Sequence, residues 1–390
     1  MFSINIKECE MLEFYKKLKF TYRRSIEALV FLVIFFGFFG YMAHVMGTAN
    51  LLNSLMHTSW DLLMNTVFFI MGITVLSGAL GKLLIEFGVV RLIEIILAPL
   101  MKPLYNLPGV SAIGALMTFL SDNPAIISLA KDPNFNKYYK PYQLVSLTNF
   151  SSAFGMGLIV ISFMTGLGYF GPALVGLAGA FVGSIISTRL MQKFSRKQLA
   201  ATENHETEGD EQQISFRREG SLFMRTLNAI LDGGKAGVDL GLAIIPGVLV
   251  ISTIIMTVSF GAKDPALGYQ GLAYEGVPIL PKISGYFSWL FEPMFGFQHP
   301  ELIAFPVTSL GAVGAALSLI NPFTAQGFIT GNEIAVFTGM GMCWSGFLST
   351  YSAMFDTLGH RNLISKAILA QTIGGISAGI IAHWLYVLIF

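Results

Sequence analysis

The sequence predicts an all-α polytopic membrane protein, built as an inverted-topology repeat with re-entrant helical hairpins and interfacial helices, plus one extra N-terminal transmembrane helix. Of the 390 residues, 54% are hydrophobic and only 12% are charged, about half the charged fraction of a soluble domain. Apolar stretches of roughly 20 residues, long enough to cross a hydrocarbon core, recur along the chain. The same order of elements then appears twice. Strands bury runs of only about 4–8 residues, which disfavours a soluble α/β enzyme.

Charge and cysteine content narrow the function classes further. The net charge of +1 gives no general attraction to nucleic acid. Cys9 and Cys343 are too few for a disulfide framework and lack metal-ligand spacing. The apolar run after residues 1–25 has no small-residue cleavage site, so we expect a retained helix rather than a signal peptide. The sequence carries no nucleophile–base pair or phosphate loop, which disfavours an enzyme.

The N-terminal part predicts one helix outside the repeats. Residues 1–25 read as a cytoplasmic segment, and 26–58 as the extra transmembrane helix, spanning about 26–46, with its loop. A second span is expected at about 60–84. Residues 86–105 carry four charged side chains among apolar ones, which suits a helix lying in the membrane interface better than one crossing it.

The first repeat, 59–189, then contains a broken apolar stretch. Residues 107–131 are too short for two passes and are interrupted by Ser121–Pro124. A polar, proline-containing break of this kind predicts a re-entrant hairpin, because non-helical backbone at membrane depth must be covered by protein or water. Spans at about 141–165 and 168–189 complete the repeat.

The hydrophilic stretch 190–220 is the predicted cytoplasmic linker, after which 221–390 forms the second, inverted repeat. Its predicted elements follow the same order: an amphipathic helix 221–236, a span 237–260, a loop 261–280, an interfacial stretch 281–297, a hairpin 299–330, and spans 332–356 and 364–388.

Short local similarities support the repeat. Leu97–Met101 resembles Phe291–Phe295, and each is followed by an X-Pro step and a small, apolar segment. Each segment then reaches a polar break, Ser121–Pro124 in the first half and Asn321–Gln326 in the second. We therefore expect the second hairpin to break at Asn321–Gln326, because Asn321 precedes a proline.

Positive charge near span ends marks the cytoplasmic side. Basic residues gather in the N-terminal segment, in 131–140, in 189–197, in 217–225, and at Arg361 and Lys366. Placing all of them inside gives a cytoplasmic N-terminus, an external C-terminus, and two halves in opposite orientations, as in many secondary transporters. The expected location is the bacterial cytoplasmic (inner) membrane.

At this point the residues resemble a known family. Thr148–Ser152, with the letters Thr-Asn-Phe-Ser-Ser, is similar to the Asn-x-Ser-Ser stretch of concentrative nucleoside transporters. Gly233–Asp239 and Ile245–Gly247 look like the YjiH-type branch of bacterial membrane proteins. The order of elements over roughly 60–390 resembles the nucleoside-recognition (Gate) domain family, which also includes ferrous-iron permeases and spore-maturation proteins. The resemblance implies an alternating-access transporter for a nucleoside-like solute.

The candidate ion-coupling residues lie beside the helix breaks. Ser121, Asp122 and Asn123 precede Pro124, where a helix start is the simpler interpretation. A broken helix also exposes carbonyl and amide groups to a cation and a polar solute, and an acid at that depth is costly unless used. The full set predicted to couple an ion is Ser121, Asp122, Asn123, Thr148 and Glu333; Glu333 is equally suited to cap the helix that follows it.

The candidate substrate-binding residues are uncharged polar side chains in apolar surroundings: Asn149, Ser151, Ser152, Thr324, Gln326 and Ser345. Such residues also join transmembrane helices, at about 0.6 kcal/mol each. Four polar positions in five at Thr148–Ser152 cannot all face one neighbour, so some are expected to face a cavity or an unwound turn.

The sequence thus favours a secondary transporter of a small polar solute, coupled to sodium or protons. A non-transporting scaffold or assembly factor, and an ion permease, stay open as alternatives. No cofactor is expected apart from a sodium ion. The expected partners are the lipid bilayer, a small-molecule substrate and a second copy of the chain, with no nucleic acid.

Overall fold

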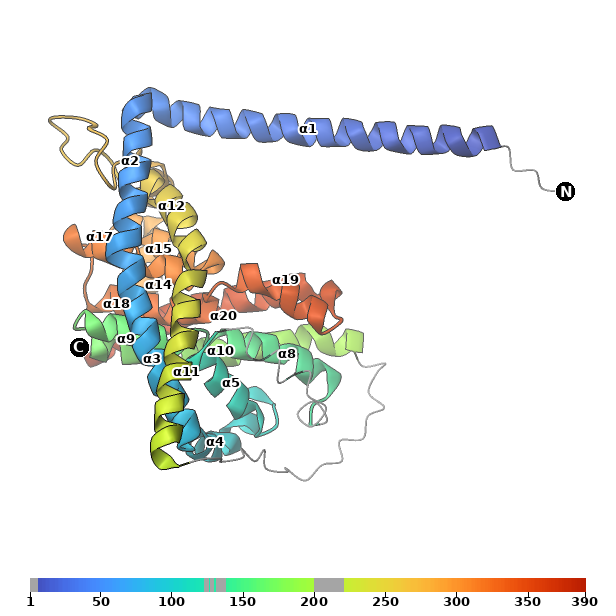
Figure 1. Ribbon diagram of the computed structural model, residues 1–390, viewed down its shortest axis with the longest axis vertical. Helices are drawn as coiled ribbons and strands as arrows, with labels where there is room; N and C mark the ends of the chain where they lie inside the picture. The colour runs from blue at the N-terminus through green and yellow to red at the C-terminus, as the bar shows by residue number, and fades with distance from the viewer. Residues whose placement is uncertain (1–5, 123–125, 127–129, 131–137, 200–220) are drawn as a thin grey trace.

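The computed structural model describes residues 6–122, 126, 130, 138–199 and 221–390 (Figure 1). These residues form helices and one isolated β-bridge, between Asp264 and Gly268. The predicted all-α fold is therefore confirmed. Within the described residues, six helices are long and apolar enough to cross a membrane: Ser25–Met46, Thr48–Glu86, Pro141–Gly166, Phe170–Leu199, Leu222–Ser259 and Arg361–Ile389.

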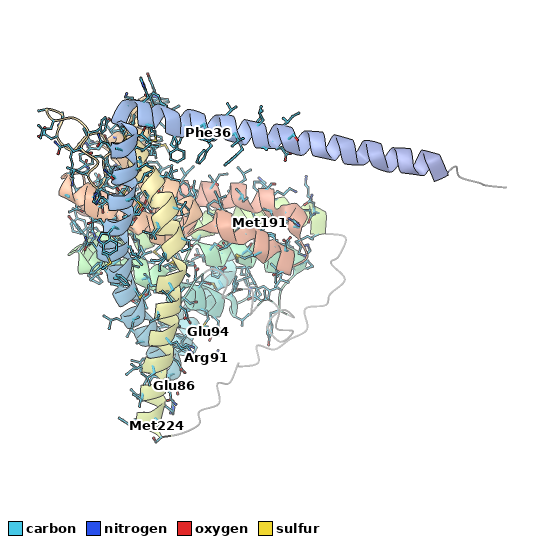
Figure 2. All side chains as sticks on the ribbon, turned by 45° about the horizontal axis from the view of Figure 1, so that its top comes forward. Phe36, Glu86, Arg91, Glu94, Met191 and Met224 are labelled. Carbon is cyan, nitrogen blue, oxygen red and sulfur yellow. The ribbon has the colours of Figure 1, made fainter. Side chains whose placement is uncertain are left out.

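The first helix, α1 (Ile6–Met46), contains the extra predicted span. It projects away from the body of the molecule, and the chain turns sharply between it and the helix that follows (Figure 1). Within Ser25–Met46 its apolar side chains are largely exposed, as Phe36 is (Figure 2). The C-terminal end packs on the body, where Met42 and Met46 form a small core with Leu51 and Val277. This exposure suits a helix that is surrounded by lipid.

Two long antiparallel helices form a helix pair along one side of the molecule (Figure 1). One runs through α2 (Thr48–Asp61), a π-helical segment (Leu62–Val67) and α3 (Phe68–Glu86). The other runs through α11 (Leu222–Ala243), a π-helical segment (Gly247–Ser252) and α12 (Thr253–Ser259). The helix pair corrects two predictions: the span expected at 60–84 begins at Thr48, and the separate helices expected at 221–236 and 237–260 are one. The two helices of the pair contact each other along their length, and this contact keeps each of them continuous.

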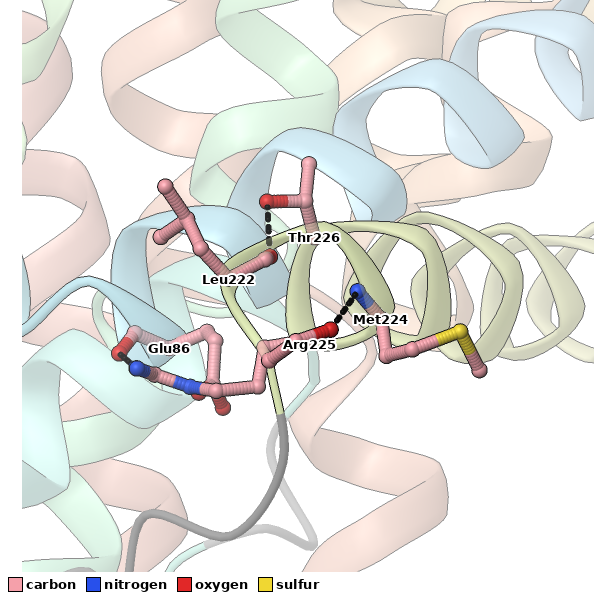
Figure 3. Close-up of polar contacts among 6 residues, drawn as sticks. Glu86, Leu222, Met224, Arg225 and Thr226 are labelled. Atoms are coloured by element: carbon pink, nitrogen blue, oxygen red, sulfur yellow. Dashed lines mark hydrogen bonds and ion pairs between the residues drawn. The ribbon is translucent and has the colours of Figure 1, made fainter.

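Small residues allow the two backbones of the helix pair to touch. A Cβ atom added at Gly233 would lie 2.3 Å from the carbonyl oxygen of Gly78, and one at Gly237 would lie 2.3 Å from that of Thr74. The Thr74 hydroxyl donates to the Gly237 carbonyl at 2.7 Å. At one end Arg225 pairs with Glu86 at 2.5 Å (Figure 3). The helix pair is therefore a rigid element.

The central bundle contains two broken helices and two continuous ones. In the first half these are α8 (Pro141–Ser152) with α9 (Gly157–Gly166), and α10 (Phe170–Leu199). In the second half they are α18 (Gly331–Trp344) with α19 (Phe347–Thr357), and α20 (Ile364–Ile389). The two broken helices run in opposite directions (Figure 1), as an inverted repeat requires. The span expected at 332–356 is interrupted after Trp344, and it is not among the six helices named above.

Short amphipathic helices and hairpins complete each half. The interfacial helices are α4 (Val89–Leu100), continued by a π-helical segment (Met101–Tyr105), and α13 (Ile279–Gly285) with α14 (Ser288–Phe295). In the first hairpin, α5 (Ser111–Leu120) ends at Ser121 as predicted, with Asp122 after it. Asn123 and most of the linker, 200–220, lie outside the described residues.

The second hairpin breaks at a different point from the one expected. After a 3₁₀ turn (Pro300–Ile303), α15 (Ala304–Gly311) stops at Ala312, whose φ of −164° and ψ of 115° are extended. The chain returns through α16 (Val313–Leu317) and α17 (Ile320–Ala325). The break predicted at Asn321–Gln326 is therefore wrong. Pro322 stands in the first turn of α17, where a proline costs no helical hydrogen bond.

Candidate functional site

The two broken helices leave their helical path at matching points. Residues 153–156 separate α8 from α9, and Met156 takes a left-handed conformation with φ of 53°. Ser345 and Gly346 separate α18 from α19, and Gly346 has φ of +78°, which favours glycine. Each break releases backbone groups from the helical hydrogen-bond pattern, so that they are able to bind other partners.

The two breaks meet inside the bundle. The Ser345 hydroxyl donates to the Ser152 carbonyl at 3.1 Å. The Gly346 amide donates to the carbonyl of Ser309, in the second hairpin, at 2.9 Å. The first hairpin reaches the same place, because a Cβ atom at Gly157 would lie 2.2 Å from the ring of Phe119. We call this meeting point of both breaks and both hairpins the junction.

Two side chains at the junction have unused hydrogen-bonding groups. The hydroxyls of Ser152 and Tyr351 are fully buried and lie close together. At hydrogen-bonding geometry, neither has a partner within the described part of the chain. A buried hydroxyl without a partner costs free energy, and most native structures avoid it. A hydroxyl both donates and accepts, and its oxygen also coordinates cations, so the pair offers contacts to a polar ligand or an ion.

Asn149 lies one helical turn before Ser152 on α8, and unlike Ser152 its side chain has hydrogen-bond partners. Its amide nitrogen lies within hydrogen-bonding distance of the Ser187 hydroxyl (3.0 Å), the Ala367 carbonyl (3.0 Å) and the Gln371 amide oxygen (3.1 Å). The Gln371 amide nitrogen in turn donates to the Cys343 carbonyl at 2.6 Å. Asn149 therefore joins α8 to α10 and α20 in this conformation. Ser187 and Gln371 were not predicted from the sequence, although each is a polar residue in an apolar span.

Replacing Asn149 by alanine is expected to lower the free energy of unfolding by about 1–2 kcal/mol, since the two N–H groups of its amide donate to buried acceptors on α10 and α20. Thermal unfolding in detergent measures the effect. Asn228→Ala on α11 is the matched control, because that side chain is exposed and has no hydrogen bond within the described residues. Equal melting temperatures for both variants would contradict the assigned contacts.

Three further predicted residues hold their own helices in this conformation. The Ser121 hydroxyl donates to the Met117 carbonyl at 2.7 Å, and the Ser151 hydroxyl donates to that of Leu147 at 2.7 Å. The Thr148 hydroxyl donates to the Val145 carbonyl at 2.8 Å. Asp122 follows Ser121 and is half-buried. Of the predicted residues, the structure thus brings Ser152 and Ser345 into direct contact.

Glu333 lies at the other end of α18. With Thr330 it forms a capping box: its carboxylate accepts from the Thr330 amide at 2.8 Å, and from the Thr330 hydroxyl. It also accepts from Asn332 at 3.1 Å, and the Asn332 amide oxygen lies 2.7 Å from Nδ1 of His383. Twelve residues of helix separate Glu333 from Ser345, which corresponds to about 18 Å. The interpretation of Glu333 as a helix cap is therefore the one that its contacts favour.

Gln326 lies elsewhere, in a cavity of about 840 Å³ with both polar and apolar lining residues, between the helix pair and the second hairpin; we call it the outer cavity. Thr324 is not in its lining; its hydroxyl donates to the Ile320 carbonyl at 2.8 Å. Asp61 from the helix pair lines the cavity opposite Glu301 and Gln326 from the hairpin.

Tyr274 anchors the loop 261–278, which lines one part of the outer cavity. The Tyr274 hydroxyl donates to the Asp61 carboxylate, and its amide donates to the Thr58 hydroxyl at 2.7 Å. Burial, and then the neighbouring carboxylate, raise the pKa of the Tyr274 phenol above its usual range, so the phenol keeps the proton that it donates.

Comparison with known proteins identifies relatives over part of the chain. No protein-family model matches. The chain is 32% identical to the sporulation integral membrane protein YlbJ of Bacillus subtilis over 126 residues, which are 30% of this chain and 29% of that protein. It is 36% identical to an uncharacterised protein of Alkalihalophilus pseudofirmus over 118 residues, 29% of this chain and 25% of the relative. Each alignment thus spans less than a third of the relative's length.

Among solved structures, the chain is similar to the concentrative nucleoside transporter CNTnw in outward-facing states. One such structure has a TM-score of 0.52 at 12% identity, covering 96% of this chain and 86% of the other. A second has a TM-score of 0.50 at 11% identity, covering 95% and 86%. The predicted resemblance to concentrative nucleoside transporters is confirmed at the level of the fold. The chain is a multi-pass membrane protein with that fold.

Proposed function

We propose that the protein is a secondary transporter that moves a small polar solute across the bacterial cytoplasmic membrane by alternating access. The observation that carries the proposal is the junction, where interrupted helices from both halves and both hairpins meet around the unpaired hydroxyls of Ser152 and Tyr351. A membrane anchor has no need for two helix breaks and unpaired buried hydroxyls, each of which costs stability.

The junction has the chemistry to hold a solute and an ion together. Backbone carbonyls and amides at a broken helix carry partial charges without side-chain charge, and they suit a cation and a polar neutral molecule at membrane depth. Sodium and the proton are both candidates for the coupling ion. Ser152 and Ser345 are proposed to contact the solute, with Tyr351 added from its position beside Ser152.

The helix pair supports the proposal as a fixed element against which the bundle moves. Its backbones touch at Gly78 and Gly233, so it cannot deform without losing that contact. The outer cavity lies between the helix pair and the second hairpin, and it is large enough for a small metabolite. We propose it as the external entrance, with Gln326 and Glu301 on the moving side.

The orientation and division of the chain follow from the same proposal. The N-terminus lies in the cytoplasm and the C-terminus outside, with 59–189 and 221–390 as the two repeats. The opposed broken helices support this division, and placing the basic clusters of the sequence in the cytoplasm gives this orientation. Assembly with further copies of the chain is part of the proposal, because most side chains of Ser25–Met46 are exposed in a single copy.

Uptake into proteoliposomes tests the function. A thermal-shift screen with nucleosides, bases, amino acids and short peptides, each with and without sodium, first selects a solute, since a ligand of the native state raises apparent stability. Uptake of that solute should then rise several-fold when an inward sodium or proton gradient is imposed. Uptake that is the same with and without either gradient would contradict coupling to sodium or protons. The absence of saturable uptake would contradict transport.

A non-transporting scaffold is the second candidate function. The partial similarity to a sporulation integral membrane protein favours it, as does the use of the Asn149 amide within the bundle. It predicts that no solute in the screen raises the melting temperature, and that Tyr351→Phe leaves growth and assembly phenotypes unchanged.

A further inference from the structure

An apolar cavity of about 560 Å³ lies between α4, α5 and α10, and it shares no lining residue with the outer cavity. Its wall on α10 consists of Leu174, Leu177, Ala178, Phe181 and Val182. These positions follow the spacing i, i+3, i+4, i+7, i+8, so they form one continuous face of the helix. Tyr105 brings a hydroxyl to the lining, and that hydroxyl donates to the Phe181 carbonyl at 3.4 Å. The wall therefore offers nothing that would orient a polar solute.

The same face of α10 ends in basic residues. Arg189 follows Val182 by seven residues, two helical turns further along, and Lys193 follows Arg189 by one turn. The Arg189 guanidinium donates to the carbonyls of Leu104 (2.8 Å) and Pro103 (2.6 Å), in the π-helical segment that also lines the cavity. Lys102 immediately precedes Pro103. Lys102 and Arg189 thus belong to segments that line the apolar cavity, and Lys193 stands one turn beyond Arg189 on α10.

These basic side chains are available to an anion. Lys102, Arg189 and Lys193 are exposed, and within the described part of the chain none of them forms an ion pair. A guanidinium has five N–H groups, and the two carbonyls engage two of them. The remaining donors of Arg189 suit a phosphate group, which arginine binds through paired hydrogen bonds.

The dimensions fit one acyl chain beneath a headgroup. From Arg189 to Leu174 the helix rises about 22 Å, and one leaflet of the hydrocarbon core is about 15 Å deep. A headgroup at Arg189 therefore leaves its acyl chain long enough to follow the wall toward Leu174. Leu174 is 42% exposed, so the far end is open to the membrane.

We propose that this cavity is a binding site for an anionic phospholipid, with one acyl chain along α10 and the phosphate between Arg189, Lys102 and Lys193. The basic end agrees with a cytoplasmic leaflet, which carries anionic lipids. Phe119 and Phe154 also line the cavity. Phe119 packs on Gly157, and Phe154 belongs to the first break. A bound acyl chain therefore contacts side chains that also pack at the junction.

Phosphatidylglycerol and phosphatidylcholine with identical acyl chains test the headgroup. In purified full-length protein, phosphatidylglycerol is expected to raise the melting temperature and to stay bound in native mass spectrometry at lower concentrations than phosphatidylcholine. Lys102→Gln and Lys193→Gln should each weaken phosphatidylglycerol binding about fivefold. Lys282→Gln, an exposed lysine on α13, is the control and should change nothing. Equal binding of the two lipids would overturn the proposal.

A second variant tests the acyl chain. Ala178→Phe fills the cavity wall and should abolish stabilisation by both lipids, whereas the lysine variants reduce only the preference for phosphatidylglycerol. Should Ala178→Phe not fold, Ala115→Phe fills the same cavity from α5. Undiminished lipid binding in a folded cavity variant, or equal stabilisation by inorganic phosphate alone, would overturn the proposal.

Discussion

An alanine at Gly237 is expected to destabilise the protein by about 3 kcal/mol or more, because its Cβ atom would lie 2.3 Å from the Thr74 carbonyl oxygen and the two backbones would have to separate. The same substitution at Gly234 should stabilise by up to about 1 kcal/mol. There the nearest atom is a Val75 methyl carbon at 3.6 Å, and alanine favours the helix more than glycine does.

The pair Gly237→Ala and Gly234→Ala makes a matched experiment, since the chemical change is the same three residues apart. Thermal unfolding in detergent should give melting temperatures on opposite sides of the unchanged protein. Two variants that shift in the same direction would contradict the backbone contact between α3 and α11.

Removal of the hydroxyl of Tyr351 is expected to reduce uptake at least about tenfold, the loss that corresponds to one hydrogen bond of about 1.4 kcal/mol in the transported complex. The melting temperature should stay unchanged or rise. The Tyr351 hydroxyl is buried without a hydrogen bond within the described residues, so its deletion removes a desolvation cost without removing a hydrogen bond.

Ser152→Ala should behave in the same way as Tyr351→Phe, since its side chain is also unpaired. Its carbonyl bond to Ser345 is a backbone contact and survives the change. Asn149→Ala provides the contrast, because it is expected to lower the melting temperature. A Tyr351→Phe variant that melts at a clearly lower temperature would show that the hydroxyl serves the fold, and unchanged uptake would remove it from the solute site.

Membrane residence and the order of elements were readable from the sequence. Apolar length decides whether a segment enters the bilayer, and interruptions by charge or proline show where it cannot continue. The interfacial helix near 86–105, the hairpin break at Ser121, and the two opposed halves all follow from such local features. The polar cluster at Thr148–Ser152 marked the region of the junction for the same reason.

Contacts between distant segments were decided by the tertiary structure. Asn321-Pro322 looked like a break, yet the chain turns at Ala312, because proline fits the first turn of α17. Thr48–Glu86 and Leu222–Ser259 are continuous because each lies against the other, which no local pattern reports. The roles of Asn149 and Ser152 differ although they stand three residues apart.

What the sequence alone determined about this protein is therefore its environment, its helices and its twofold plan, since each depends on the composition of one segment at a time. Only the packing of α8, α10, α19 and α20 decided which polar side chains have hydrogen-bond partners. Asn149 has them, whereas the hydroxyls of Ser152 and Tyr351 stay unpaired within the described residues. The hydrogen-bond partners of a buried side chain come from segments that are distant in the sequence, and only the folded structure brings them within hydrogen-bonding distance.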